Sequence, residues 1–444
     1  FSPMEIFTCR TIKLPEKGVE KRLETFARYA YNRVNVKNNL GGKMLNTVKK
    51  YHLALFYVIY IGFCLASNFV HPVTPAFLQL INCSNSMFGF AYSAMALGQF
   101  LTSALWGKVG DKIGYSKAIA LGFFGYAFSA LVFSMAKGPT LVIAGRFIAG
   151  CVVSSIQVNS MAYLTSIDAP MEERNSLLVL YASLQSICSA FGFLVGGLIG
   201  DFSVYYSFYA QIAALTVTGI ITLVFIHEHS AFKKSEDKLT LKDVNPFTSI
   251  IQSTKILNVV VAVFLVSTLV TWFASAGFDQ NFNYYLRAKF NFAPSSSGMF
   301  KAAVGLISLT VNMTINMWIV KKTNVSKSLC AVVALAGVSI LAMVFSQTQT
   351  QVMVFALMYY AFYAIYLPLQ QAVMLKNDDK SSKGAVSGLF NAAKSFGMMA
   401  GPLFAGLVFD INPDYAFMTF GAGLIIGAII CHVNYKMLVK KGIK

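Results

Sequence analysis

The chain has 444 residues, of which 56% are hydrophobic and only 12% are charged, and its mean hydropathy is +0.61. Because soluble domains carry about 25% charged residues, this composition excludes a soluble globular protein and predicts a polytopic membrane protein. The formal net charge is +18, but the basic residues lie in short segments between apolar runs, which argues against a nucleic-acid partner. The seven cysteines are scattered singly, without disulfide or zinc spacing, so no metal site is expected.

Residues 1–50 form a basic segment before the first apolar run. Within it, residues 1–43 are polar and unpatterned, and they lack the apolar region of a secretory signal peptide. Met44 begins a sequence that is typical of an ordinary start just before a first span. We interpret residues 1–43 as an upstream translation or a dispensable cytoplasmic tail.

Apolar runs of about 18 or more residues are long enough to cross a bilayer as helices. Twelve such runs follow one another, and a polar segment divides them six and six. They predict an all-α membrane protein with an N-terminal bundle (51–226), a cytoplasmic central loop (227–255), a C-terminal bundle (256–438) and a cytoplasmic tail (439–444). The expected spans are 51–70, 87–106, 118–136, 139–165, 175–200, 205–226, 256–283, 296–320, 328–346, 350–375, 384–409 and 415–438.

The basic residues define an orientation. With the N-terminus in the cytoplasm, all but six of the 36 Lys and Arg residues fall in the tails and in the loops on the cytoplasmic side. This distribution follows the positive-inside rule and predicts that both termini are cytoplasmic.

Residues 106–117 connect the second and third spans. Three lysines, one aspartate and three glycines in so short a segment predict a tight loop, because glycine reaches positive φ without a Cβ clash. A fainter copy of this segment surrounds Trp318, and the pattern Phe-Gly-x-x-x-Gly occurs at both 191–196 and 396–401. These repeats indicate two related halves, as in known transporter architectures.

Polar side chains recur at helical spacing inside several spans, most clearly in the first, fourth, seventh and tenth. A polar group in hydrocarbon is costly unless it is satisfied, so such stripes face a cavity or a neighbouring helix. The striped spans are three apart along the chain, as the first helix of each three-helix unit would be, and this predicts that they share a central water-accessible cavity. For any single Ser or Asn, interhelical hydrogen bonding is the alternative. The residues expected to line this substrate cavity are Tyr57, Asn68, Gln157, Trp272, Asn283, Asn312, Tyr359, Tyr363, Tyr366, Gln370 and Lys394.

Three charged residues lie well inside the predicted spans, where a charge is costly: Arg146, Asp279 and Lys394. Lys301 falls at the outer end of the span 296–320. Asp279 is the acid placed well within a span, and we expect it to exchange protons unless it sits close to the outer surface. Arg146 would bias that protonation or bind anionic groups, a structural ion pair being the alternative. Lys394 would pair with an acid or extend its ammonium to the interface.

Over roughly residues 47–440, the chain resembles the major facilitator superfamily. The segment 107–117 is similar to the family's signature between spans 2 and 3, Gly-x-Leu-Ala-Asp-Arg-x-Gly-Arg-Lys. The resemblance implies the major facilitator fold, with two pseudo-symmetric six-helix bundles that rock around a midplane site. It also implies that Asp111 faces the amino end of span 11, near residues 382–386, where a carboxylate is favourable by about 0.3–1 kcal/mol. This conformational lock would stabilise the outward-open state; its residues are Gly107, Asp111, Lys112, Gly114 and Lys117.

Further motifs are most similar to the drug/proton antiporter branch. Arg146 lies in a Leu-x-x-x-x-Arg-x-x-x-Gly pattern that is similar to the family's span 4 motif, whose arginine is associated with proton coupling. Glycines at 192, 196 and 200 resemble the antiporter motif of span 5, with Gly197 where the family has Pro. The sequence His-Pro-Val-Thr-Pro at 71–75 resembles the span 1 exit of drug-efflux members, and Asn68 stands where those members often carry an acid.

We therefore predict a multi-pass cell-membrane transporter that works by alternating access and couples export of amphipathic organic compounds to protons. The alternative is a proton-coupled symporter of a small organic anion or other metabolite, with Arg146 and Lys394 making the cavity positive. An enzyme is not expected, because the chain has no H-E-x-x-H or G-x-S-x-G motif, and the lack of a P-loop motif excludes transport driven by ATP. We expect a monomer that binds a small-molecule substrate, protons and lipid, with no cofactor.

Overall fold

The computed structural model describes residues 52–84, 86–167, 171–226, 228, 258–376 and 383–440. The predicted N-terminal segment 1–50 and nearly all of the predicted central loop 227–255 therefore lie outside the described residues. By internal packing the chain divides into two units, Phe1–Phe56 and Tyr57–Lys444. Of the first unit only residues 52–56 are described, and the account below concerns the second.

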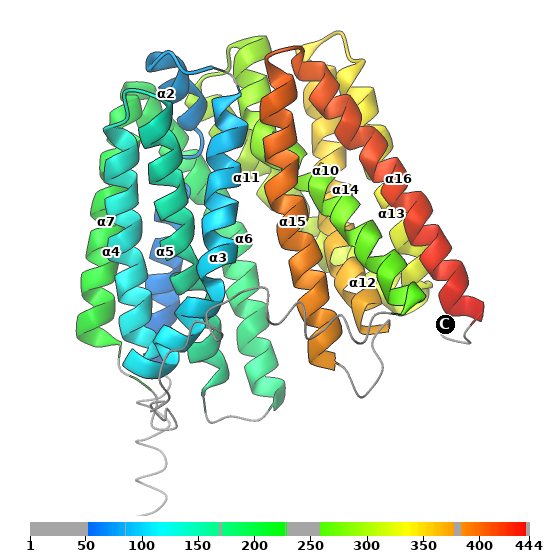
Figure 1. Cartoon of the computed structure of the whole chain (residues 1–444), viewed down its shortest axis with the longest axis horizontal. Coiled ribbons are helices and arrows are strands. Elements are labelled where there is room, and N and C mark those ends of the chain that lie inside the picture. Colours follow the sequence, from blue (N-terminus) through cyan, green and yellow to red (C-terminus); the bar gives the residue numbers. More distant parts are fainter. Residues whose placement is uncertain are drawn as a thin grey trace, which may run out of the picture. The chain divides into compact units, whose positions relative to one another are not determined.

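The described chain is built of α-helices, as the composition predicted. Among the described residues, ten helices are long and apolar enough to cross a membrane. A first helix, His52–Ala66, is shorter. The others are α2 (Thr74–Leu80), α3 (Met87–Ile113), α4 (Tyr115–Ser134), α5 (Pro139–Thr165), α6 (Met171–Phe202), α7 (Val204–Phe225), α10 (Val259–Phe290), α11 (Pro294–Val311), α12 (Met317–Lys322), α13 (Val325–Val344), α14 (Gln349–Lys376), α15 (Lys383–Phe409) and α16 (Pro413–Lys440) (Figure 1).

Several helices differ from the predicted spans in their bounds. α10 continues to Phe290, where hydropathy predicted an end at 283. The span expected at 296–320 is divided into α11, a π-helical turn at Asn312–Asn316 and α12. A backbone hydrogen-bond ladder can extend beyond the apolar stretch, and a π-turn inserts one residue without changing hydropathy. Neither feature can therefore be read from an average of hydrophobicity.

The connection between α3 and α4 is a single residue. α3 continues through the predicted loop to Ile113, and α4 begins at Tyr115. Only Gly114 is non-helical, with φ at +105°, a conformation that suits glycine because it has no Cβ. The prediction of a loop over 106–117 was therefore wrong in extent, since Gly107, Asp111 and Lys112 are helical and the turn is made at Gly114 alone.

The helix ends follow local sequence. Asn258 begins α10 by accepting a hydrogen bond from the backbone N–H of Val261 at 3.0 Å, which satisfies a donor that has no partner within the helix. α5 and α11 each begin with proline, whose fixed φ suits the first helical position. At its other end α10 stops at Asn291, which is left-handed with φ at +50°.

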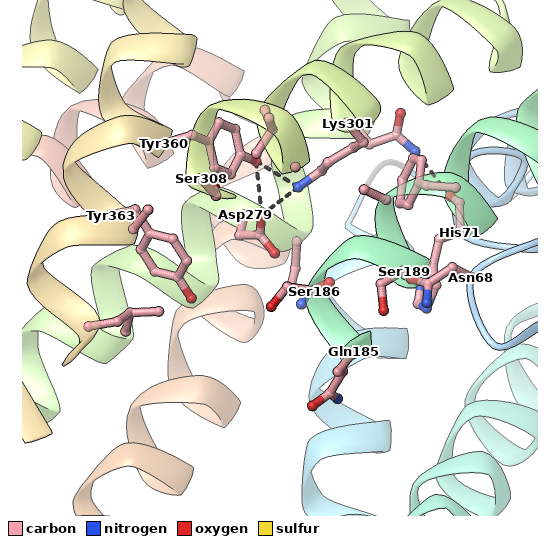
Figure 2. Close-up of a pocket in the computed structure, with 18 of the residues that line it drawn as sticks. Asn68, His71, Gln185, Ser186, Ser189, Asp279, Lys301, Ser308, Tyr360 and Tyr363 are labelled. Carbon is pink, nitrogen blue, oxygen red and sulfur yellow. Dashed lines mark hydrogen bonds and ion pairs between the residues drawn. The ribbon is translucent and has the colours of Figure 1, made fainter. Parts of the chain in front are cut away.

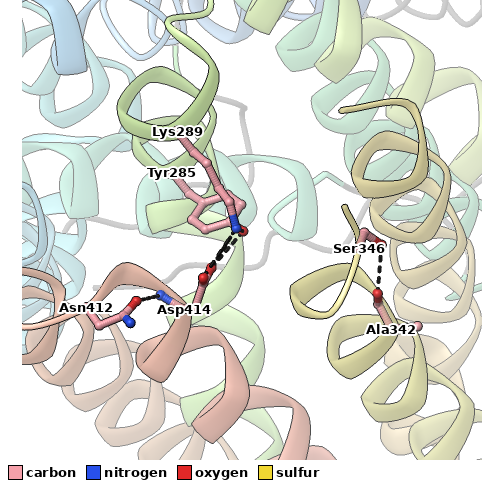
Figure 3. Close-up of polar contacts among 6 residues, drawn as sticks. All are labelled: Tyr285, Lys289, Ala342, Ser346, Asn412 and Asp414. Carbon is pink, nitrogen blue, oxygen red and sulfur yellow. Dashed lines mark hydrogen bonds and ion pairs between the residues drawn. The ribbon is translucent and has the colours of Figure 1, made fainter. Parts of the chain in front are cut away.

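The helices are described as two sets in chain order, α3 to α7 and α10 to α16. Most packing lies within a set, as between α3 and α5 or between α10 and α15, but α6 packs mainly on α11 of the other set. Within the second set, Lys289 of α10 lies 3.0 Å from a carboxylate oxygen of Asp414 on α16. The Tyr285 hydroxyl donates to the same oxygen and accepts from Lys289 (Figure 3). This triad joins the end of α10 to the start of α16.

Small residues bring the two sets together at one end, where α3 begins and α15 ends. There α3 runs beside α15 (Figure 1), and α6 packs on α11. A Cβ at Gly89 would overlap the carbonyl oxygen of Pro402 and the backbone of Gly406. A Cβ at Gly298 would lie 2.9 Å from the Cα of Leu194. Close approach of this kind gives van der Waals contact between helices where the hydrophobic effect cannot drive association.

Hydrogen bonds join the two sets near the same end, which we call the sealed end. The Ser93 hydroxyl donates to the carbonyl of Met399 at 2.8 Å. The Asp201 carboxylate accepts from the backbone N–H of Ser295, in the first turn of α11, at 3.1 Å. An anion at a helix N-terminus is favourable, so this contact stabilises the closed arrangement.

We expect Gly89→Val to lower the stability of the purified protein by about 1–3 kcal/mol, because the added side chain cannot fit between α3 and α15. The measurement is the thermal unfolding midpoint in detergent. Gly138→Val is the matched control, since nothing lies within 4 Å of a Cβ at Gly138. Equal midpoints for the two variants would show that the sealed end does not depend on this close contact.

Candidate substrate cavity

A cavity of about 570 Å³ lies between the two helix sets. Its walls come from α6, α10, α11, α14, the segment after the first helix, and Tyr92 of α3. A second cavity of about 300 Å³ shares six lining residues with it, so the two adjoin. The shared residues are Asn68, His71, Tyr92, Gln185, Ser189 and Gln280. Both polar groups and aromatic rings therefore face one continuous space.

An Asp–Lys–Tyr triad forms one wall of the larger cavity (Figure 2). The ammonium of Lys301 on α11 lies 2.5 Å from the carboxylate of Asp279 on α10. It also donates to the Tyr360 hydroxyl at 2.8 Å, and that hydroxyl donates to Asp279 at 2.9 Å. The Lys301 side chain is 16% exposed and that of Asp279 is 29% exposed. Both charges are thus partly withdrawn from solvent and each has a charged partner.

A second polar group lies on the opposite side of the cavity. The ring of His71 has its Nδ1 2.5 Å from the hydroxyl of Tyr92. The Asn283 amide donates to the carbonyl of His71 at 3.0 Å, which ties α10 to the segment after the first helix. The carbonyl oxygen of the Asn283 side chain is buried without a hydrogen-bond partner. This oxygen is an acceptor at the cavity wall that a ligand or water can satisfy.

Six of the predicted site residues line the two cavities. Five come from the first, seventh, eighth and tenth predicted spans, and the sixth, Gln157, comes from α5 and faces the smaller cavity. Asn312 stands at the first position of the π-turn, and π-turns recur at functional sites. The six are Asn68, Gln157, Asp279, Asn283, Asn312 and Tyr363.

Other predicted residues are not among those that line the two cavities, because they are packed between helices. Trp272 donates its ring N–H to Gln370, which in turn donates to Thr271. Tyr359 is fully buried against aromatic rings that include Phe278. This group consists of Tyr57, Trp272, Tyr359, Tyr366, Gln370 and Lys394.

Three of these residues join neighbouring helices. The Tyr57 hydroxyl donates to the carbonyl of Leu177 on α6 at 2.8 Å. The Tyr366 hydroxyl hydrogen-bonds to Ser275 of α10. Lys394 places its ammonium 4.4 Å from the ring centre of Trp272, a cation–π contact that explains how a lysine is held between helices. The spacing identified polar faces, but it could not distinguish an interhelical face from a cavity face.

Arg146 lies behind the cavity wall and does not line either cavity. It is 4% exposed and donates to the Thr74 hydroxyl at the start of α2 at 2.8 Å. Its guanidinium stands 4.5 Å from the ring centre of Phe133 and 5.5 Å from that of Tyr92. The aromatic faces stabilise the cation where hydrogen bonding is incomplete, since its Nε has no partner. Arg146 therefore lies one side chain away from the cavity, behind Tyr92.

The predicted lock residues lie around the turn at Gly114. Asp111 accepts a hydrogen bond from the Tyr115 hydroxyl at 2.9 Å, whereas Lys112 and Lys117 are exposed. Gly107 is half-buried beside Val158. Of the segment expected to face Asp111, residue 382 and the side chains of residues 383–385 lie outside the described part of the chain. The lock itself therefore stays a prediction.

An unexpected carboxylate lies beside this turn. Glu228 accepts the backbone N–H of Ser116 at 2.7 Å and so caps α4. A Cβ at Gly114 would lie 2.7 Å from the same carboxylate oxygen. Glu228 thus holds the turn from the segment that follows α7, a long-range contact that no local sequence pattern predicts.

Sequence reasoning did not select Lys301 as a site residue. The sequence analysis placed this lysine at the outer end of the predicted span 296–320. Lys301 lies eight residues into α11, and a charge so far inside a helix was the available signal. The serines and glutamine that α6 contributes to the cavity, at 185, 186 and 189, were also missed.

A polar cavity between long apolar helices is the arrangement expected of a polytopic membrane transporter. The chain belongs to the Major Facilitator Superfamily, because the sequence model of that family matches residues 56–402 and 282–437. The resemblance seen in segment 107–117 is thereby confirmed. The protein is a secondary active transporter that works by alternating access, and it is not an enzyme.

The chain is similar to drug-resistance transporters. It is 24% identical to "Multidrug resistance protein 2" of Bacillus subtilis (strain 168), covering 87% of this chain and 95% of that protein. It is 22% identical to "Quinolone resistance protein NorA" of Staphylococcus aureus (strain COL), covering 85% and 95%.

Solved structures share the fold. A bacterial homologue of the human lysosomal transporter Spinster, in an inward-facing and occupied conformation, superposes with a TM-score of 0.71 at 12% identity, covering 88% of this chain and 98% of that one. The human organic anion transporter MFSD10 (TETRAN) gives a TM-score of 0.61 at 15% identity, covering 85% and 98%.

We expect Ser308→Cys and Ser186→Cys, in a cysteine-free background, to react quickly with a charged thiol reagent in detergent, because both positions line the cavity. Gln370→Cys should react at least tenfold more slowly, since Gln370 is 1% exposed, and a tenfold ratio corresponds to about 1.4 kcal/mol of opening free energy. The labelling rate is the measurement. Similar rates at all three positions would contradict the cavity boundary described above.

Proposed function

We propose that this protein exports amphipathic organic compounds from the cell in exchange for protons. The observation that carries the proposal is Asp279, the carboxylate that faces a cavity lined by both aromatic and amide side chains. A cavity of this composition offers stacking surface together with a few orienting polar groups, as small-molecule sites do. The drug-resistance transporters to which the chain is similar support this substrate class.

We infer an architecture of twelve spans in two pseudo-symmetric six-helix bundles, in the cell membrane, as a monomer with both termini cytoplasmic. Most helix packing lies within α3 to α7 or within α10 to α16, which supports a division at the central segment, although α6 packs mainly on α11 across that division. The positive-inside distribution places the turn at Gly114 in the cytoplasm, and this makes the sealed end the outer one. In this assignment the structure is closed to the outside, and the lock at Asp111 is formed only in the opposite state.

In the transport cycle, contacts between the helix sets at the sealed end would alternate with contacts on the inner side. Opening the outer side requires separation of α3 from α15 and of α6 from α11, which breaks the Ser93–Met399 and Asp201–Ser295 hydrogen bonds. The loss is offset when Asp111 meets the amino end of α15 on the inner side. Arg146 supports α2 and Tyr92 at the outer side and biases protonation of the cavity through its positive charge.

Asp279 is the proposed proton-exchanging group. In its ionised form it is held by Lys301 and Tyr360. Its protonation removes the ion pair and leaves the Lys301 ammonium facing a neutral carboxyl group, which is a weaker interaction. The state of this carboxyl therefore alters the contact between α10, α11 and α14 and can be linked to their movement.

We expect Asp279→Asn to abolish proton-driven transport in reconstituted vesicles, to the level of protein-free vesicles, while substrate binding is kept. The reason is that an amide cannot exchange a proton but fills the same volume. Uptake of cationic and anionic aromatic dyes under an imposed pH gradient is the measurement.

Asp414→Asn is the matched control, because Asp414 forms an equivalent Lys–Tyr triad away from the cavity. It should lose stability without losing proton coupling. Retained coupling in Asp279→Asn would reject this carboxyl as the exchanging group.

The second candidate is a proton symporter of a small organic anion, with Arg146 and Lys394 as the cationic groups. This hypothesis predicts that Arg146→Ala or Lys394→Ala abolishes substrate uptake and that added carboxylate compounds compete with the substrate for transport. Neither residue is among those that line the two cavities, so the geometry favours the exporter. A pH change driven by organic acids alone, with none for dyes, would reverse this preference.

A further inference from the structure

The smaller cavity is polar, yet none of the described residues that line it is an Asp, Glu, Lys or Arg. Apart from the imidazole of His71, its polar groups are hydroxyl, sulfur and carboxamide groups. Carboxamides are the most frequent of these, and the larger cavity adds more of them. Besides Asn312 of the π-turn, six face the joined cavities, and we call them the amide site: Asn68, Gln99, Gln157, Gln185, Gln280 and Asn283.

Two asparagines of the amide site present their side-chain oxygens in a fixed direction. Asn68 donates its N–H groups to the carbonyl of Cys64 at 2.9 Å and to the hydroxyl of Ser67 at 3.1 Å. Asn283 donates to the carbonyl of His71 at 3.0 Å. Because a backbone carbonyl can only accept, each amide nitrogen must face the backbone, and each side-chain oxygen is left for another donor.

Asn283 shows that such a donor is needed. Its side chain is 5% exposed, and its oxygen has no hydrogen-bond partner among the described residues. A buried acceptor without a donor is costly, so a molecule that brings an N–H group to this oxygen gains more than the bond is worth in water. The two asparagines therefore favour a ligand that donates.

The four glutamines supply adjustable groups. They come from α3, α5, α6 and α10, and their amides make no hydrogen bond within the part of the chain that the structure describes. A carboxamide presents donor and acceptor side by side, and it forms two hydrogen bonds with a planar edge of the same kind, as glutamine does with adenine. Figure 2 shows Gln185 and Asn68 apart from Lys301 and Tyr360. The glutamines can therefore pair with both the donor and the acceptor of a neutral planar group.

The apolar lining of the smaller cavity suits a flat molecule. Aromatic rings stack on planar bodies, and unbranched methionine side chains adapt to different shapes. The ring of His71 is stacked on that of Tyr92, with their centres 5.7 Å apart. The other rings and the methionines are Phe63, Tyr126, Met95 and Met398.

A charged ligand would find no free partner. Removing an ammonium or a carboxylate from water costs far more than removing a carboxamide, unless an opposite charge receives it. Among the described residues that line the two cavities, the acid is Asp279 and the strong base is Lys301, and they are paired with each other. The charge pattern therefore favours a neutral ligand.

We propose that the amide site binds the polar group of the substrate, and that the preferred substrates are uncharged aromatic compounds with an N–H donor beside a carbonyl acceptor. Primary amides, lactams and ureas have this arrangement. The proposal rests on the export function proposed above and narrows its substrate class. Substrate and proton then bind different side chains, and movement of α10, which carries Asp279, Gln280 and Asn283, couples them.

The test is equilibrium binding to the full chain in detergent at neutral pH, with three probes of similar size. They are 2-naphthamide, methyl 2-naphthoate, which keeps the carbonyl but has no N–H, and 2-naphthylmethylammonium, which is a cation. Wild-type protein should bind 2-naphthamide about tenfold more tightly than either of the others, a difference of one or two neutral hydrogen bonds. Equal affinity for the three, or tightest binding of the cation, would overturn the proposal.

Substitutions locate the binding to the amide site. Asn283→Leu should weaken 2-naphthamide about tenfold. The double variant Gln185→Leu/Gln280→Leu should do the same, and it removes no hydrogen bond within the described protein, so it serves if Asn283→Leu does not fold. Gln349→Leu is the matched control and should bind as wild type, because Gln349 is exposed at the start of α14 and lines neither cavity. Unchanged affinity in the double variant would contradict the assignment.

A change of specificity provides a gain-of-binding measurement. Gln185→Glu keeps the shape of the side chain and supplies the carboxylate that the amide site lacks. It should raise the affinity for 2-naphthylmethylammonium about tenfold, because a charge-assisted hydrogen bond is stronger than a neutral one. No gain for the cation would show that position 185 does not contact the polar group of the ligand.

The export function is judged separately, by proton-driven transport in vesicles. Proton-driven transport of dyes by a protein that does not prefer 2-naphthamide would keep the export function and remove the amide site. Binding in the predicted pattern without proton-driven transport of any probe would keep the amide site and remove the export function.

Discussion

Backbone-to-backbone contact at the sealed end is the constraint on which the rest of the structure depends. In a bilayer, lipid chains are as apolar as leucine, so helices associate through close packing and hydrogen bonds. Gly89 and Gly298 allow α3 to meet α15 and α6 to meet α11 at distances that any Cβ would prevent. Because both contacts lie at one end, the cavity is bounded there and its lining residues are brought together from both helix sets.

The polarity of the cavity has a physical cost that the structure meets locally. Asp279, Lys301 and Tyr360 satisfy one another, and His71 is paired with Tyr92. Arg146 is stabilised by aromatic rings and one hydroxyl, without a carboxylate partner in the described contacts. A partly buried charged pair is sensitive to the loss of either charge. One proton on Asp279 is therefore enough to change how α10 interacts with α11.

The sequence predicted the fold class well and the site only in part. Long apolar runs and the signature around Asp111 are local features, and they identified a helical membrane transporter and its family. The role of a polar residue depends on which helix faces it, and that is a long-range property. Gln370 and Asn283 have similar spacing signals, yet Gln370 is buried against Trp272 and Asn283 borders the cavity. Lys301 was undervalued because its pairing with Asp279 joins two helices and leaves no trace in either segment alone.

The π-turn at Asn312–Asn316 has a mechanical consequence. A wide turn interrupts the regular ladder, and helices bend most readily where that ladder is interrupted. Asn316 donates to the side chain of Asn312 across the turn, which keeps the two segments connected while they change direction. Lys301 lies on the segment before the turn, and α12 lies after it. A bend at this turn would change the direction of α12 while Lys301 on α11 keeps its contact with Asp279. Movement of α12 therefore need not disturb the charged pair.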